Sequence, residues 1–439
     1  MVYNAGMRKI VVWTCVVLAA AKVFAAASAA LPETGRNVPK LTIDWGKPQP
    51  IDRGDYPRLR VLADGRYALV YSQLRPVPGA GRALYALIRY STDRGATWSA
   101  AEQVIAPPVV KDRDGTDLAV NPANSELTQL TPKHSKRPGR LVYSVNLRPN
   151  GNRSSVFPFS IAYKVSDDAG RTWSELRTPY KAPLWPDNAF RGCWEPYVQE
   201  LPGGTLHLYF SDETPYWKRG STDQNISYLV STDGGETWSG PKIAAYTEGG
   251  RDGMPVTLVL GNRLYMAIEA PHADHLDWPL RQRIVSTDVA DPWRKPVLGH
   301  SPFRYDPIMP SFGADLYGGA PYLVQTEHYL LLSGQFAKTR PHEKRSIVSW
   351  TTWPVWAMRK DEVGPAGELT SFRDPTCPLG DANPICWSSL TALGGDEVMA
   401  VLCNQSHGFD STITLVRGRV REAAAAHTPC EGCPARWQK

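Results

Sequence analysis

An eight-residue motif, Ser-x-Asp-x-Gly-x-Thr-Trp, occurs three times in the chain and constrains the fold more than any other feature of the sequence. The intact copies are residues 91–98, 166–173 and 231–238, and a degenerate copy at 286–293 keeps only the Ser, the Asp and the Trp. Successive copies begin 75, 65 and 55 residues apart. Self-similarity at such a period indicates that one supersecondary unit is repeated along the chain.

The chemistry of the motif is that of a tight turn. Asp, Ser and Thr side chains can bond backbone amides that a turn leaves unpaired, and Gly adopts a positive φ at little steric cost. The Trp that follows is suited to packing between neighbouring strands. We therefore predict that Asp93, Asp168 and Asp233 stabilise turns and take no part in chemistry.

These motifs resemble the Asp boxes, or bacterial neuraminidase repeats, of the sialidase superfamily. The resemblance implies β-propeller blades, with each box between the third and fourth strands of a blade. Four boxed blades, and chain enough for two more after residue 293, predict an all-β fold: a six-bladed β-propeller of the sialidase type over residues 44–420. A strand at 41–45 is placed to close the ring against the last blade.

The two ends of the chain have a different character. Arg8 and Lys9 precede an apolar run and a stretch of small residues, which predicts a signal peptide over residues 1–30, with a retained signal anchor as the alternative. We expect a linker at 31–43, a polar tail at 421–439, and a secreted or periplasmic protein with no stable membrane insertion after cleavage.

Composition excludes several classes of protein. Hydrophobic residues make up 42% of the chain, enough for a large core. The net charge of +6 falls to about +3 without the signal peptide, and there is no basic stripe, so we predict no nucleic-acid partner. We expect the protein to be a monomer.

Propeller topology predicts where chemistry can occur. The start of the first strand and the end of the second strand of each blade share the face opposite the boxes. Glu195 and Glu269 occupy such positions on adjacent blades, in apolar surroundings where a carboxylate is costly to bury without a task or a partner. Two carboxylates are what glycoside hydrolysis needs. The alternative is that each merely pairs with a cation such as Arg191 or Arg251.

A narrower resemblance covers about the middle third of the chain. Trp-Glu-Pro at 194–196, Leu-Tyr-Phe-Ser-Asp-Glu at 208–213, Gln224, Arg-Asp-Gly-Met at 251–254 and Glu269 together look like glycoside hydrolase family 93. The resemblance implies a retaining, exo-acting enzyme that attacks α-1,5-linked L-arabinan, with Glu195 as acid/base and Glu269 as nucleophile. The partner is then an oligosaccharide or polysaccharide. The predicted substrate-binding residues are Arg58, Asp212, Arg251, Asp252 and Tyr322.

Two other functions remain open. Resemblance to ordinary sialidases implies three arginines around a carboxylate, a Tyr nucleophile paired with Glu, and an Asp acid. Arg58 could be the first arginine and Arg148, Arg251 and Arg304 are candidates for the others, but no Asp is a persuasive acid. A non-catalytic propeller that binds glycan or protein is the second alternative, which the glutamate pair disfavours.

We predict no cofactor and no metal. His and Asp alternate at 272–277, but no strand or helix fixes these side chains, so a rim loop that hydrogen-bonds sugar is the favoured interpretation over a metal site. Cys430 and Cys433 form a lone Cys-x-x-Cys pair in the tail without two further ligands nearby. Cys377 and Cys386 flank a polar loop and are a plausible disulfide.

Overall fold

The computed structural model describes residues 39–150, 154–187, 191–271, 280–308, 316–339, 347–380, 385–404 and 411–423. The chain divides into two compact units, Met1–Pro39 and Lys40–Lys439, and every described strand belongs to the second unit. Among the described residues, no helix is long and apolar enough to cross a membrane. The predicted signal peptide, most of the tail with Cys430 and Cys433, and the loop at 272–277 lie outside the described residues.

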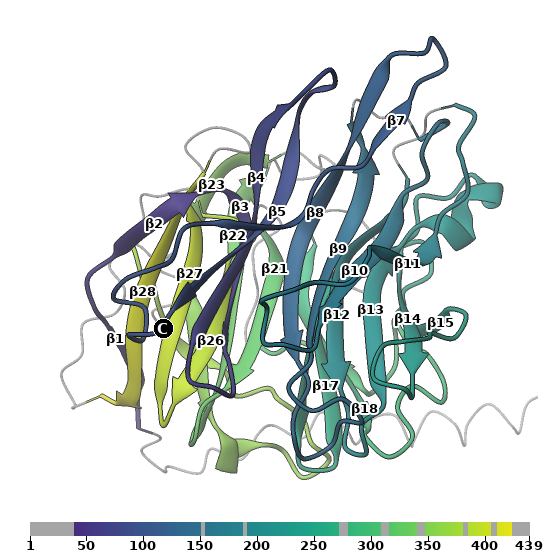
Figure 1. Cartoon of the computed structure of the whole chain (residues 1–439). Helices are drawn as coiled ribbons and strands as arrows, with labels where there is room; N and C mark the ends of the chain where they lie inside the picture. Colours follow the sequence, from purple (N-terminus) through teal and green to yellow (C-terminus); the bar gives the residue numbers. More distant parts are fainter. Residues whose placement is uncertain are drawn as a thin grey trace, which may run out of the picture. The chain divides into compact units, whose positions relative to one another are not determined.

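The strands form six sheets, numbered here as blades 1 to 6 in chain order (Figure 1). Blade 1 contains β3 (Asp55–Val61), β4 (Tyr67–Val77), β5 (Gly81–Ser91) and β6 (Glu102–Ile105). Blade 2 contains β7 (Val109–Lys111), β8 (Asp117–Gln129), β9 (Leu141–Pro149), β10 (Ser160–Ser166) and β11 (Arg177–Lys181). Blade 3 contains β12 (Cys193–Glu200), β13 (Leu206–Asp212), β14 (Asn225–Ser231), β15 (Lys242–Tyr246) and the short parallel β19 (Val297–Leu298).

The remaining three sheets follow the same plan. Blade 4 contains β16 (Gly253–Leu260), β17 (Arg263–Ala270), β18 (Arg281–Asp288) and β20 (Arg304–Tyr305). Blade 5 contains β21 (Leu316–Gln325), β22 (Tyr329–Thr339), β23 (Ile347–Thr352), β24 (Val355–Arg359) and β25 (Arg373–Thr376). Blade 6 contains β26 (Ser389–Gly394), β27 (Glu397–Asn404), β28 (Thr412–Glu422) and, from the start of the chain, β1 (Leu41–Trp45) and β2 (Gln49–Arg53). Two short 3₁₀ turns, Thr214–Arg219 and Lys360–Glu362, follow strands of blades 3 and 5.

Apolar side chains hold neighbouring blades together. Six clusters of buried residues fill the six seams between consecutive blades, including the seam between blades 6 and 1. Along β4, Leu69 packs with blade 6 whereas its neighbour Val70 packs with blade 2, because successive strand residues point to opposite faces. Both faces of an inner strand are therefore buried, and the fold is the predicted all-β, six-bladed propeller of the sialidase type.

The ring closes with strands from both ends of the second unit. β1 pairs antiparallel with β28, so the purple N-terminal strand lies beside the yellow C-terminal one (Figure 1). Sheet pairing begins at Leu41 and ends at Glu422, a few residues outside the predicted limits of 44–420.

The three intact boxes fold as turns between β5 and β6 in blade 1, β10 and β11 in blade 2, and β14 and β15 in blade 3; these are the third and fourth strands of each blade when the short β7 is left out of the count. In the first, a carboxylate oxygen of Asp93 accepts from the Ser91 hydroxyl (2.7 Å) and the Thr97 amide (2.9 Å), while the Ser91 hydroxyl accepts from the Gly95 amide (2.7 Å). The same contacts recur in the other two. Each box Trp packs into the seam with the preceding blade; these residues are Trp98, Trp173, Trp238 and, in the degenerate copy, Trp293.

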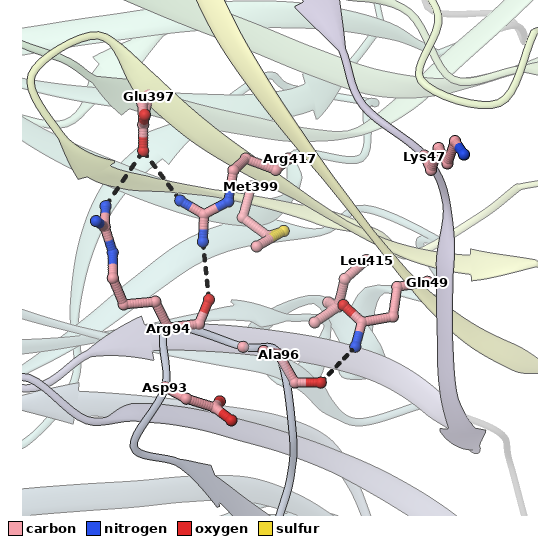
Figure 2. Close-up of a pocket in the computed structure, with 10 residues that line it drawn as sticks. Lys47, Gln49, Asp93, Arg94, Ala96, Glu397, Met399, Leu415 and Arg417 are labelled. Carbon is pink, nitrogen blue, oxygen red and sulfur yellow. Dashed lines mark hydrogen bonds and ion pairs between the residues drawn. The ribbon is translucent and has the colours of Figure 1, made fainter.

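A pocket of about 330 Å³ opens where the first box meets blade 6 (Figure 2). One carboxylate oxygen of Glu397 lies 3.3 Å from the Arg94 guanidinium and 2.9 Å from that of Arg417, and Arg417 also donates to the Arg94 carbonyl (2.8 Å). On the other side, Gln49 donates to the Ala96 carbonyl (3.2 Å). The arginines and the glutamate thus bind one another across the closing seam of the ring.

The predicted Cys377–Cys386 disulfide is wrong, because none of the four cysteines in the described part of the chain forms a disulfide. Cys377 follows the outer strand of blade 5, and its sulfur lies 3.3 Å from the Thr352 hydroxyl. Cys386 instead precedes the innermost strand of blade 6, where its amide donates to the Cys403 carbonyl (3.2 Å). The composition of the loop does not show that Cys377 belongs to blade 5 and Cys386 to blade 6.

Candidate active site

A polar pocket of about 480 Å³ lies on blades 2 to 4. Its charged lining residues are Arg148, Arg191, Glu195, Glu213, Asp223, Arg251 and Glu269. Strand register places Glu269 opposite Gly253, at the end of β17 and the start of β16, whereas the degenerate box of the same blade begins where β18 ends. The pocket and the boxes are therefore at opposite ends of the strands, as the topology predicted.

A left-handed residue lies in the innermost strand of blades 1 to 5 and just before the innermost strand of blade 6. Six residues other than glycine have φ between 44° and 54° there: Tyr56, Asn124, Glu195, Met254, Ala320 and, just before β26, Trp387. In blades 1 to 5 the pairing register slips at the same place, so these residues lie in β-bulges. A bulge re-aims a side chain and releases an amide from the ladder. Glu195 is the only carboxylate among the six.

The released amides connect consecutive blades in a repeated contact, which we call the bulge-amide clasp. The Met254 amide donates to the Ser211 hydroxyl (2.9 Å) and the Ala320 amide donates to Glu269 Oε2 (3.1 Å). The Trp387 amide donates to the Gln335 side-chain oxygen (2.8 Å). The three acceptors occupy equivalent register positions in blades 3, 4 and 5, so Glu269 stands where the flanking blades have Ser and Gln.

Two donors hold one oxygen of Glu269. The Tyr317 hydroxyl donates to Oε2 (2.9 Å) beside the Ala320 amide, and Gln335 in turn donates to the Tyr317 oxygen (3.3 Å). Burial raises the pKa of Glu269, while the Ala320 amide, the Tyr317 hydroxyl and the charge of Arg251 oppose that rise.

Glycines make room for this carboxylate. A Cβ on Gly253 would lie 2.7 Å from the side-chain nitrogen of Gln224 and 3.3 Å from Glu269 Oε1, and a Cβ on Gly319 would collide with Tyr317 and Glu269 Oε2. Neither glycine has a positive φ, so close approach and not backbone conformation requires them.

Glu195 is held more lightly than Glu269. The Ser211 hydroxyl donates to its Oε2 (2.6 Å). Burial and then the charge of Glu269 raise the pKa of Glu195 to about 7, against the Ser211 hydroxyl, the Met254 amide and the Arg251 charge. Near neutral pH this carboxyl is therefore partly protonated beside a second carboxylate, and it can give or take a proton.

Arg251 braces the pocket wall. Its guanidinium pairs with Glu213 (2.5 Å) and donates to the Gln224 side-chain oxygen (2.7 Å). Glu213 also accepts from the Gly192 amide (2.9 Å) and from the indole N–H of Trp194 (3.2 Å). Among the predicted substrate-binding residues, Arg251 is the one that lines the pocket.

The other four predicted substrate-binding residues are buried and bonded inside the protein. Arg58 stacks on Tyr56 (3.8 Å to the ring centre) and pairs with Glu126 (3.4 Å). Asp252 forms a buried ion pair with Arg304 (2.5 Å). Asp212 accepts from Thr214, Ser227 and Tyr180, and Tyr322 accepts from Arg60 (3.0 Å). Their role as sugar ligands stays a prediction.

Sequence reasoning assigned no role in holding the pair to the residues that do so, namely Ser211, Tyr317, Ala320 and Gln335. It also missed an apolar cluster beside them, formed by Tyr56, Met254, Ala320 and the half-buried Trp387. One signal was available: four of the six left-handed residues precede a proline, at 56–57, 195–196, 254–255 and 320–321. Proline within a sheet is confined to edges and bulges, so this recurrence indicates bulges.

No metal site accompanies the pocket in the part of the chain that the structure describes, where no three His, Cys, Asp or Glu side chains gather to hold an ion.

Comparison with known proteins places the fold among sialidase-type propellers. Residues 42–245 match the BNR repeat-like domain family, and no curated protein sequence matches the chain. An α-L-arabinanase of Penicillium chrysogenum solved with arabinobiose is 16% identical, with 85% of this chain and 98% of that chain covered and a TM-score of 0.58. The GH93 α-L-arabinofuranosidase of Fusarium graminearum with arabinobiose is 17% identical over the same shares, with a TM-score of 0.55.

A Hadza microbial sialidase is also similar, at 17% identity and a TM-score of 0.50, with 84% of this chain and 66% of that chain covered. At these identities the likeness defines the fold alone. The predicted resemblance to sialidases and to glycoside hydrolase family 93 is thus confirmed for the fold.

Proposed function

We propose that the protein is an exo-acting, retaining glycoside hydrolase of arabinanase type that removes terminal sugars from a glycan. The observation that carries this proposal is the pair of unlike carboxylates in one pocket. Glu269 has two donors on one oxygen, whereas Glu195 has a pKa of about 7. Two titratable groups whose environments differ in this way are typical of an acid and nucleophile pair.

In the proposed reaction, an oxygen of ionised Glu269 attacks the anomeric carbon while the proton of Glu195 passes to the leaving glycosidic oxygen. This yields a glycosyl ester on Glu269 and a free alcohol. Glu195, now ionised, takes a proton from water, whose oxygen attacks the anomeric carbon and releases the sugar. Glu269 leaves as a carboxylate, and both groups return to their first state.

An exo-α-sialidase is the second candidate, favoured by the Tyr317–Glu269 hydrogen bond (2.9 Å). A Tyr nucleophile must lose its proton, but burial and Glu269 raise the pKa of Tyr317 well above 10. The hydroxyl accepts from Gln335 and donates to Glu269, which suits a residue that holds the carboxylate. Of the arginines considered for a sialic-acid carboxylate, Arg304 is bound to Asp252. The arabinanase-type reaction is therefore preferred.

The test is a screen of the purified protein on α-1,5-linked arabino-oligosaccharides and on sialosides, with the anomer of the first product followed by NMR. We expect single sugars with retained configuration from the arabino-oligosaccharides. Release from sialosides alone would support the sialidase, and binding without release from any glycan would support a non-catalytic propeller.

We also propose that the protein is exported after removal of residues 1–30 and acts as a monomer. The basic and apolar pattern at the N-terminus supports export. N-terminal sequencing of the mature protein and size-exclusion chromatography with light scattering test these two points.

A further inference from the structure

Ser211 connects the catalytic pair to the bulge-amide clasp. It lies near the end of β13 and is fully buried. Its Oγ is 2.9 Å from the Met254 amide nitrogen and 2.6 Å from Glu195 Oε2. A peptide N–H can only donate, so the serine oxygen is the acceptor in the first contact.

The direction of the second contact follows from the number of hydrogens. A serine hydroxyl has one hydrogen, and among the described contacts Glu195 Oε2 is its only acceptor. If the carboxyl proton were on Oε2, it would point at the serine, and the serine hydrogen would be buried without a partner. That arrangement is penalised because a buried polar hydrogen then loses its hydrogen bond.

We propose that Ser211 is a positioning residue that keeps the acid proton of Glu195 on Oε1. This inference rests on the proposed function. The Ser211 hydroxyl occupies Oε2 and Glu195 lines the pocket, so Oε1 is the oxygen left for a leaving group or a water there. The serine donates to Oε2 whether Glu195 is charged or neutral. The same oxygen, Oε1, therefore gives its proton to the leaving group in the first step and takes a proton from water in the second.

The clasp explains why the serine cannot turn away. Met254 is left-handed, and its amide is released from the β16 ladder by the bulge, so the amide is fixed in its direction toward blade 3. The adjacent blade uses the same device on Glu269 through the Ala320 amide. In blade 4 the Ala320 amide therefore binds the carboxylate of Glu269 directly. In blade 3 the Met254 amide binds Ser211, and Ser211 in turn binds the carboxylate of Glu195.

The test compares Ser211→Ala with a matched control, Ser227→Ala. Ser227 is also a buried serine whose hydroxyl donates to a buried carboxylate, Asp212 (3.0 Å), but Asp212 does not line the pocket. Glutamate labelled with ¹³C at Cδ reports carboxyl titration by NMR, and the Glu195 signal is the one missing in Glu195→Gln. We expect the pKa of Glu195 to rise by about half a unit to one unit in Ser211→Ala and to stay unchanged in Ser227→Ala.

Kinetics give a second readout. We expect kcat on arabino-oligosaccharides to fall about tenfold or more in Ser211→Ala, with much less loss on an aryl arabinoside whose leaving group needs no proton. A merely structural role would lower both rates equally and leave the titration unmoved, and either result would overturn the proposal. If the wild-type protein cleaves no substrate, the proposed function fails, yet the NMR titration still decides whether Ser211 controls Glu195.

Discussion

Replacing Glu195 with Gln is expected to stabilise the fold while it removes the acid. Glutamine keeps the shape, and its amide oxygen can accept the Ser211 hydrogen bond now made to Oε2. In the folded protein the pKa of Glu195 is about 7, against 4.5 for an ordinary glutamate. Each unit of difference corresponds to about 1.4 kcal/mol, so ionisation of Glu195 costs folding up to about 3 kcal/mol.

The sign follows from which state binds the proton more tightly. A raised pKa means that the folded protein holds the Glu195 proton more tightly than the unfolded chain does. The cost is absent below the unfolded pKa of about 4.5, grows to about 2 kcal/mol at pH 6, and levels off near 3 kcal/mol by pH 8. Glu195→Gln removes the titrating group, so its advantage over the wild type should follow the same curve.

The assay is equilibrium unfolding in urea at pH 4, 6 and 8 for both proteins, with equal m-values required. Asp93→Asn is a control of opposite sign, because hydrogen bonds from Thr97 and Ser91 lower the pKa of Asp93 to about 2. That carboxylate contributes stability above the unfolded pKa, and the contribution is lost as the pH falls through about 2. We expect Asp93→Asn to be less stable than the wild type at pH 6 and 8. A pH-independent difference between wild type and Glu195→Gln would refute the argument that its surroundings and the charge of Glu269 raise the pKa of Glu195.

The remaining predictions concern activity and packing. Glu195→Gln should slow hydrolysis by about 10²-fold to 10⁴-fold, least with activated leaving groups, whereas Glu269→Gln should abolish turnover of all substrates in steady-state assays; near wild-type rates in both variants would exclude the mechanism. The rate should fall by half near pH 7 on the alkaline side, because Glu195 must carry its proton, and a pH profile flat to pH 9 would contradict this. Gly319→Ala should lower stability by about 1–3 kcal/mol and reduce kcat, since its Cβ collides with Tyr317 and Glu269; unchanged melting and kinetics would show that the site is looser than described. Asp168→Ala should lower the melting temperature and leave kcat unchanged, because the turn loses the hydrogen bonds that Asp168 accepts from Ser166 and Thr172; loss of turnover at constant melting temperature would give the boxes a role in chemistry.

Much of the fold is encoded in short stretches of sequence. The box contacts join Asp93 to residues no more than four positions away, so the hydrogen bonds that define the turn are encoded within the motif itself. Spacing of the motifs then predicts the number of blades. The sequence also predicts Glu195 and Glu269 as site residues, because both lie at strand ends on the face opposite the boxes. The positions of the turns and the alternation of apolar and polar residues show which end of a strand a residue occupies.

The identity of the ion-pair partners could not be predicted in the same way. The sequence predicts Arg58 and Asp252 as sugar ligands because both lie near strand starts on the face opposite the boxes. In the folded protein Arg58 pairs with Glu126 of the next blade, and Asp252 pairs with Arg304 on the outermost strand of its own blade, 52 residues further along the chain. Nothing in local sequence distinguishes a charge that faces the pocket from one that is neutralised by a neighbour.

The sequence by itself thus determined the repeating unit and the two carboxylates, whereas the tertiary structure decided how those carboxylates are held. Contacts of the clasp join residues 43 to 52 positions apart: Met254 with Ser211, Ala320 with Glu269, and Trp387 with Gln335. Each depends on a bulge that frees one amide and on the next blade bringing that amide to its acceptor. The alternation of residues along a strand determines which face of the sheet a side chain lies on. The acceptor of a released amide lies on another blade, so this contact forms only when the blades pack together.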